Sequence, residues 1–163
     1  MAVDITLKFS GPDLKGESKL KGYEGQIDVL SWSWGMTQTG TFHGGGGGGA
    51  GKVNVQDLSF TKYFDKSSAT LMLKCSDGTH FEEAVMSIRK AGEKPLEYLK
   101  VTLNKVMITS VSEGGTGSDE RLMENITLNF AKVKVEYFEQ SEKGGKATGA
   151  VNYGWDVPGN AKW

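Results

Sequence analysis

Hydrophobic and polar residues alternate along most of this chain, which is the pattern of β-strands that bury one face. The first alternating stretch places Ile5, Leu7 and Phe9 on one face, with Thr6 and Lys8 between them. Four later stretches also alternate, but each changes phase once: 27–34, 53–60, 99–108 and 126–137. A slip of one residue turns every later side chain to the opposite face of the strand. The four slips therefore predict bulges or bends at which strands curve or pass between sheets.

Such curved strands predict a fold dominated by β-structure, an antiparallel β-barrel made of two sheets. Turn-forming residues separate the strands at 10–13, 92–95 and 113–118. The segment 81–90 is ambiguous, because Glu82, Glu83 and Ala84 favour a helix whereas Val85 and the flanking alternation favour a strand. We assign it to a strand.

The length of 163 residues suits one domain with a sizeable core, and we assign 1–163 to a single domain. One short α-helix is expected, with Asp65 or Ser67 capping its N-terminus and Gly78 ending it. Its shared face would carry Leu71, Met72 and Cys75. We also expect a protruding arm at about 37–52, and a glycine-rich tail at about 144–163 that wraps over the barrel or ends loosely.

Residues 44–49 are six consecutive glycines, and Ala50, Gly51 and Lys52 follow them. This run partly matches a phosphate-binding loop, which needs a Ser or Thr after the lysine and a helix after the loop. Val53 stands in place of the hydroxyl, and the residues beyond it alternate as in a strand. Nucleotide binding is therefore disfavoured.

The glycine run is costly to order, because each glycine loses about 0.5–1 kcal/mol more than alanine when its backbone is fixed. It is therefore either a flexible connector or a segment held by another chain. The preceding segment, 37–43, has high β-propensity and carries an aromatic residue, which favours an arm that pairs with a neighbour. The residues assigned to this arm are Thr37, Gln38, Thr39, Thr41, Phe42, His43, Gly44, Gly49 and Lys52.

Composition narrows the classes of partner. The net charge is −1 with acidic and basic residues interspersed, so bulk electrostatics indicates neither a nucleic acid nor a membrane. The N-terminus lacks a basic region followed by a long apolar stretch, so we expect neither a Sec-type signal peptide nor a membrane anchor. The single Cys75 excludes an intramolecular disulfide and predicts folding in a reducing cytoplasm. Any export would use a route that accepts folded protein.

No set of residues indicates catalysis. Cys75 and His80 could form a nucleophile pair, but a helix thiol against apolar neighbours and a surface histidine are favoured. His43 and His80 have no spacing typical of metal ligands. We expect no enzyme activity and no cofactor.

Two other pairs have an ordinary and a functional interpretation. Trp32 and Trp34 share a face, so packing in the core is favoured over stacking on a ligand. Lys132 and Lys134 lie on the strand face opposite to that of Val133 and Val135. They could contact a partner, but exposure to water is favoured.

The sequence Ile-Asp-Val-Leu-Ser-Trp-Ser-Trp-Gly-Met at 27–36 resembles the haemolysin co-regulated protein family, the tube subunits of bacterial type VI secretion systems. The glycine run through Lys62 resembles the same family, as do 87–92, 124–131 and the closing motif Tyr153-Gly154-Trp155. These segments follow one another in order over nearly the whole chain. The likeness is therefore more specific than any single motif.

The resemblance implies a β-barrel of two sheets with a helix on one side. It implies homohexameric rings with a wide channel, stacked into a tube inside a contractile sheath and beneath a spike protein. Some members carry small effector proteins in the channel. The arm at 37–52 would reach a neighbouring subunit or the next ring. The protein would be made in the bacterial cytoplasm and secreted without a cleaved signal peptide.

Two other functions compete with a tube subunit. A solitary barrel could bind a small ligand through Trp32, Trp34 or the aromatic residues of the tail. An enzyme could use Lys52 to hydrolyse a nucleotide or Cys75 as a thiol nucleophile.

Overall fold

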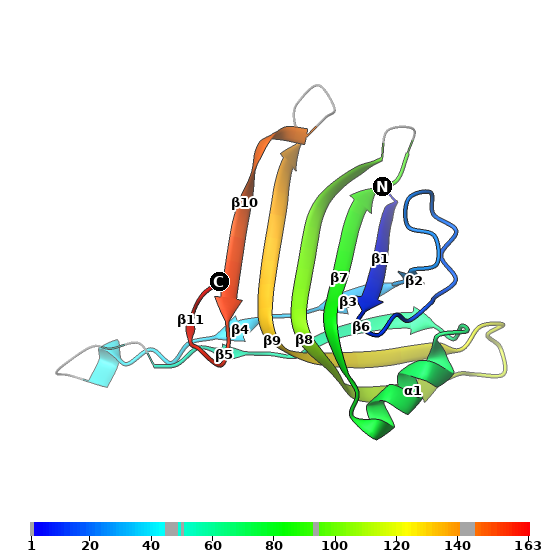
Figure 1. The fold of residues 1–163 in the computed structure, drawn as a ribbon, viewed down its shortest axis with the longest axis horizontal. Coiled ribbons are helices and arrows are strands. Elements are labelled where there is room, and N and C mark those ends of the chain that lie inside the picture. The colour runs from blue at the N-terminus through cyan, green and yellow to red at the C-terminus, as the bar shows by residue number, and fades with distance from the viewer. Residues whose placement is uncertain (1, 45–48, 50, 93–94, 141–145) are drawn as a thin grey trace.

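The structure, a computed structural model, is built mainly from antiparallel strands (Figure 1). It describes residues 2–44, 49, 51–92, 95–140 and 146–163, with the backbone alone at 146–148. The elements in chain order are β1 (Val3–Ser10), β2 (Ile27–Asp28), β3 (Ser31–Ser33), β4 (Met36–Thr37), the 3-10 helix η1 (Phe42–Gly44), β5 (Asn54–Val55), β6 (Leu58–Tyr63), α1 (Ser68–Asp77), β7 (His80–Lys90), β8 (Leu96–Gly114), β9 (Met123–Gln140), β10 (Lys146–Asp156) and β11 (Ala161–Lys162).

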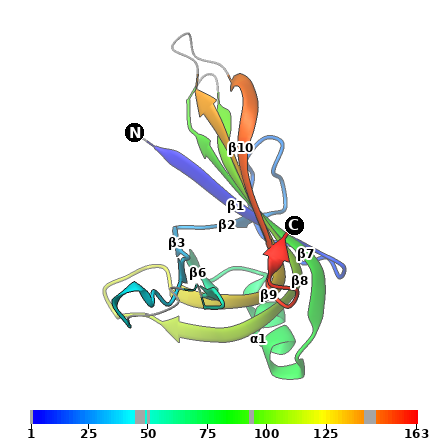
Figure 2. The same cartoon turned by 90° about the vertical axis from the view of Figure 1, so that its left-hand side faces the viewer.

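One strongly bent sheet forms two layers, named here from their places in Figure 1. The upper layer has the order β11-β10-β9-β8-β7-β1-β2. The lower layer contains β3 and β6, together with the first part of β9 and the last part of β8. The strands β8 and β9 thus run through both layers, and Figure 2 shows the two layers at an angle to each other. The predicted fold class is confirmed: two antiparallel sheets, a short helix and a protruding arm.

The chain joins the two layers a second time between β2 and β3. The Val29 amide donates to the carbonyl of Ile5 in β1, at 2.9 Å, and the next amide, Leu30, donates to Thr61 of β6, at 2.8 Å. Neighbouring residues therefore bond to different layers. This crossing links the two layers on the side away from the bend of β8 and β9, although the described strands do not form a closed barrel.

The four changes of phase correspond to bends and crossings. The slip in 27–34 is the crossing from β2 to β3, and the slip in 53–60 is the break between β5 and β6. In β8 the slip falls at Lys105, which has a left-handed φ of 52°. The register passes from Asn104↔Lys132 to Val106↔Phe130, so β8 and β9 bend at the same level. At the bend the apolar positions of β8 change from odd-numbered to even-numbered residues. The apolar side chains therefore still face the interior on both sides of the bend.

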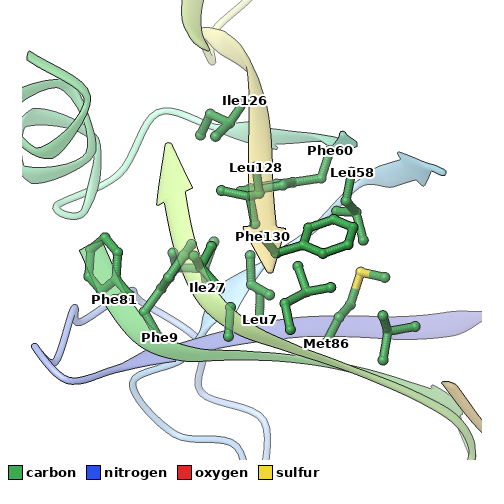
Figure 3. Packing of buried hydrophobic residues seen from close by; sticks show 14 of the residues in the cluster. Leu7, Phe9, Ile27, Leu58, Phe60, Phe81, Met86, Ile126, Leu128 and Phe130 are labelled. Atoms are coloured by element: carbon green, nitrogen blue, oxygen red, sulfur yellow. The ribbon is translucent and has the colours of Figure 1, made fainter. Parts of the chain in front are cut away.

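The core lies between the two layers. Figure 3 shows Leu58 and Phe60 of β6 with Leu128 and Phe130 of β9, close to Leu7 of β1. At one end the rings of Phe9 and Phe81 lie 4.7 Å apart between centroids. Each fully buried side chain of this size stabilises the fold by roughly 1.5–3 kcal/mol relative to exposure.

The helix α1 forms where the sequence predicts it. Gly78 ends it with a left-handed φ of 70°, and its amide donates to the carbonyl of Lys74. Leu71 is fully buried and Cys75 packs against the core, so the predicted shared face is confirmed for these two residues. Met72 is half-buried and does not belong to the core cluster. At the N-terminus, the side chain of Ser67 does not cap the helix; the Asp65 carboxylate instead accepts the Ser67 amide at 2.8 Å.

The expectation that the tail at about 144–163 wraps over the barrel or ends loosely is wrong for β10. This strand pairs with β9 from Ala150↔Phe138 to Asp156↔Lys132 and extends the upper layer by one strand. After a turn, β11 pairs back onto Trp155 and Asp156. The assignment of 81–90 to a strand is confirmed, since β7 spans His80–Lys90.

Trp32 and Trp34 are half-buried and pack against the core, as predicted. The ring of Trp34 lies edge-on to Phe130 at 6.2 Å. The prediction that Lys132 and Lys134 face water is only partly right. Their ammonium groups lie over the ring of Trp163, at 5.6 and 4.6 Å from its centroid.

Candidate assembly surfaces

The arm is anchored by a two-stranded sheet at its root. In this sheet β4 pairs with β5 through Met36↔Val55 and Thr37↔Asn54. The Gln56 amide donates to the carbonyl of Gly35 at 3.0 Å, and the Trp34 indole donates to the carbonyl of Gln56 at 2.9 Å. The direction in which the arm leaves the barrel is thus fixed by backbone pairing and by a half-buried tryptophan.

The outer part of the arm has few contacts with its own barrel, and in Figure 1 it extends away from it. Phe42 is 88% exposed, and Thr39, His43 and Lys52 are also exposed. The arm's two sides are joined at Thr41, whose hydroxyl donates to the carbonyl of Gly49 at 2.7 Å. Residues 45–48 of the glycine run, and Ala50 after it, lie outside the described residues. An aromatic side chain held this far from the core is available to another molecule.

A shallow apolar groove lies between the arm's root and β10. Its volume is about 450 Å3, and its lining includes Met36, Val53, Tyr153 and Trp155. The Tyr153 hydroxyl donates to the sulfur of Met36 at 3.7 Å, and burial raises the pKa of this tyrosine. These contacts attach the arm to the C-terminal strand of the same chain.

The second candidate surface is a row of apolar side chains across the upper layer, here called the apolar row. Strand register places its members directly beside one another: Ile5, Ile88, Leu99, Tyr137 and Val151. Exposure rises along the row from 3% at Ile88 to 43% at Tyr137 and 72% at Val151. The barrel therefore covers the row at β1 and β7 but leaves it bare at β9 and β10.

The outer edge of β10 is also open. The strand β11 pairs only with Trp155 and Asp156, and in the described part of the chain no strand lies beside 149–153. An unpaired strand edge presents backbone donors and acceptors to another chain. The open edge and the bare end of the apolar row thus occur on the same strand.

The third candidate surface is the outer side of the lower layer, here called the hydroxyl face. Its side chains are short hydroxyls and amides aligned in rows by strand register: Ser31, Ser33, Ser59, Thr61, Asn125, Thr127, Asn129, Ser110 and Ser112. They bond to one another, for example Ser59 to Asn125 at 3.1 Å and Ser110 to Thr127 at 2.6 Å. Asp57 accepts bonds from Thr109 and Asn129, both at 2.8 Å. The result is a polar surface of short side chains.

Among the candidate chemical residues, Lys52 and His80 line one open pocket of about 400 Å3, whereas Cys75 does not line it. Residues after Lys52 form β5 rather than a helix, so the partial phosphate loop lacks the helix N-terminus that would bind a phosphate. His80 begins β7, opposite Met107, and is exposed, whereas Cys75 packs against the core. Within the described residues, no three metal-binding side chains of the His, Cys, Asp or Glu type form a group. None of the described helices is long and apolar enough to cross a membrane.

Comparison with known proteins identifies the family. Residues 6–137 match the family described as "Type VI secretion system effector, Hcp". Protein hcp1 of Pseudomonas aeruginosa is 56% identical over 163 residues, covering 99% of both chains. This chain belongs to the Hcp family. The resemblance described from the sequence is therefore confirmed.

Solved structures agree with this family. The crystal structure of Hcp1 from Salmonella typhimurium has a TM-score of 0.81 at 36% identity and covers all of both chains. A structure titled as a type six secretion system protein has a TM-score of 0.92 at 26% identity, covering 99% of this chain and 100% of that one. Hcp proteins are structural secreted proteins of type VI secretion rather than a class of enzymes.

Sequence reasoning did not identify the apolar row or the hydroxyl face. Both consist of residues far apart in the chain that only strand register aligns. The one available signal for the exposed end of the row was the alternation of Val151, Tyr153 and Trp155, which predicts a strand.

Proposed function

We propose that this Hcp chain is the structural subunit of the type VI secretion tube: six copies close into a ring, and rings stack into a hollow tube that a contractile sheath propels. The observation that supports this most is the apolar row, bare at Tyr137 and Val151 beside the open edge of β10. A second copy is the occupant that the row fits best. Contacts between different surfaces of identical chains generate rings when the rotation closes.

The arm serves contacts between copies. Its root is fixed by β4 and β5, whereas Phe42 is almost fully exposed, so the arm presents an aromatic group well away from its own core. Packing of Phe42 and its neighbours on another subunit, or on the next ring, offsets the cost of ordering the glycine run. The proposed arm residues remain those from Thr37 to Lys52 named above.

The hydroxyl face lines the channel of the proposed ring, where small effector proteins are carried. Short hydroxyl and amide groups offer hydrogen bonds without deep pockets, so many different proteins can contact them weakly. The chain would fold in the cytoplasm and leave the cell with the tube, beneath a spike protein, without removal of a signal peptide. No chemical step and no cofactor are needed.

Mass and shape test the proposal directly. Multi-angle light scattering of the purified chain should give about six times its mass of 17.6 kDa, and negative-stain microscopy should show rings. A mass of one chain at every concentration, without annular particles, would contradict the tube subunit. It would instead favour a solitary barrel that binds a small ligand.

The apolar row has its own test. Val151→Glu should raise the concentration at which rings dissociate by about tenfold or more, because it places an unpaired charge in a buried contact. The substitution should leave the fold intact, since Val151 is 72% exposed. Asn152→Glu is the matched control, because the neighbouring residue points to the other face of β10. Equal effects of the two substitutions on dissociation would contradict the role of the row.

Co-purification of small effector proteins tests whether the hydroxyl face lines the channel. Ser112→Arg adds a long cation to this face, where Ser112 is exposed, and should reduce co-purification of small effectors by about tenfold while rings still form. Exposed Lys19→Arg, outside the face, is the control. Unchanged co-purification with Ser112→Arg would argue against this face as the channel lining.

A further inference from the structure

A buried cationic side chain holds the end of the barrel near the start of α1. Lys62 of β6 is 0% exposed, and its ammonium group donates to the Tyr63 carbonyl at 2.9 Å, to Asp65 at 3.0 Å and to the Ser68 hydroxyl at 3.1 Å. It also donates to Oε2 of Glu124 in β9. Four acceptors from β6, the following turn, α1 and β9 thus meet at one buried charge.

Glu124 is only half satisfied by these contacts. Its side chain is 1% exposed, and Oε2 accepts both Lys62 and the Ser68 hydroxyl, the latter at 2.7 Å. The second oxygen, Oε1, is buried and has no hydrogen-bond partner among the described residues. A buried carboxylate oxygen without a donor is unfavourable, because it has lost its hydrogen bonds to water and gained none in return. Oε1 of Glu124 is therefore an unused acceptor for a hydrogen bond.

Glu113 is the residue placed to donate that hydrogen bond. Strand register puts it directly opposite Glu124 in the β8–β9 ladder, one pair beyond Ser112↔Asn125. Residues opposite each other in an antiparallel pair point to the same face. Here that face is the one of Ile126, which is fully buried. Glu113 thus lies at the solvent-exposed rim of the core face, in the same ladder pair as Glu124.

The charges around this pair favour one shared proton. Lys62 is the cation that contacts the cluster, and three carboxyl groups surround it: Asp65, Glu113 and Glu124. The nearby Arg121, in the loop between β8 and β9, has its guanidinium 3.9 Å from the ring centroid of Tyr63. With all three carboxyl groups ionised, one cation would face three negative charges.

We propose that Glu113 and Glu124 share a proton, and that this carboxyl pair is a pH-sensitive lock on the end of the β8–β9 hairpin. In the protonated state the Glu113 hydroxyl donates to Oε1 of Glu124, and Lys62 neutralises the remaining charge. When the proton leaves to solvent, two carboxylates face each other across the ladder and the hairpin end opens more often. The lock acts within one chain and does not depend on ring formation.

The direction of the pH effect follows from the pKa of Glu113. Burial, the hydrogen bond that the protonated Glu113 carboxyl makes with Glu124, and the charge of Glu124 raise this pKa to about 7, and Lys62 opposes the shift. A carboxyl group with a raised folded-state pKa stabilises the fold most at pH values below its unfolded pKa, and this stability is lost as pH rises through the folded pKa. The hairpin end should therefore loosen between about pH 4.5 and pH 7, with the effect complete slightly above.

Hydrogen exchange measured by mass spectrometry on the intact protein tests the lock. After correction for the chemical exchange rate, peptides covering 110–125 should open at most about tenfold more often at pH 8 than at pH 6, since solvent screening at the exposed Glu113 reduces the full effect. Glu113→Gln keeps a permanent donor toward Glu124 and should abolish this pH dependence. Glu120→Gln, in the same loop, should retain it.

The outcomes are distinct. A tenfold or smaller change that disappears in Glu113→Gln and persists in Glu120→Gln supports the shared proton. Wild-type exchange that is independent of pH overturns it, as does a pH dependence that survives in Glu113→Gln. Circular dichroism of each variant at both pH values confirms that the comparison is made between folded proteins.

Discussion

Replacing Lys62 with methionine is expected to lower the free energy of unfolding by about 3–5 kcal/mol, because it leaves the Glu124 carboxylate buried without its cation. Lys62 is 0% exposed, and its removal also takes a donor from the Tyr63 carbonyl, Asp65 and Ser68. Methionine has a similar length and shape, so the loss reports the missing charge rather than a cavity. Denaturant titration at a fixed protein concentration measures it.

Two further variants sharpen this test. Lys66→Met, at an exposed lysine in the turn before α1, should change stability by less than about 0.5 kcal/mol. The double variant Lys62→Met with Glu124→Leu should be more stable than Lys62→Met alone, because apolar pairs often replace buried ion pairs at little cost. A Lys62→Met protein within about 1 kcal/mol of the wild type would mean that the buried charge contributes little.

Deleting residues 44–49 is expected to leave the barrel folded while nearly abolishing the growth of rings into tubes. The described parts of the arm contact the core only near the root, through Trp34, Met36 and Tyr153, and the deletion leaves these residues in place. It shortens the reach of the segment that carries Phe42, which is 88% exposed. Thermal unfolding should be nearly unchanged, and electron microscopy should show at least about tenfold fewer stacked rings.

A length-matched control separates reach from composition. Replacing the same six glycines by six serines keeps the arm's length and should preserve stacking to a large extent, since serine is also compatible with irregular backbone. Tubes formed normally by the deletion variant would refute the arm's role between rings. Loss of folding in that variant would instead show that the barrel itself depends on the arm.

The strands of the barrel could be predicted because each one is marked by a pattern of neighbouring residues. Alternation gives the strands, and each change of phase marks a place where the chain bends or changes partner, as at Lys105 and at Val29 and Leu30. The helix was predictable because Gly78 ends it and Leu71 and Cys75 share a face. Strong local signals therefore fixed most element types, together with the family resemblance.

The misses have a different physical origin. The strand β10 contains Gly149 and Gly154, which lower its strand propensity, and its pairing with β9 is a tertiary contact. Lys62 and Glu124 lie 62 residues apart, and charged residues in a strand are ordinarily assigned to solvent. The proposed assembly surfaces could not be predicted from the sequence, because strand register aligns residues that are far apart in the chain. The arm was identified, but its root pairing through β4 and β5 was not.

The passage of β8 and β9 through both layers has a mechanical consequence. A push on one layer reaches the other through unbroken covalent backbone rather than through a hinge. The two strands are cross-linked along their length from Leu99↔Tyr137 to Gly114↔Met123, so a shearing load is divided among many hydrogen bonds at once. A particle assembled from such units would transmit thrust as a stiff column.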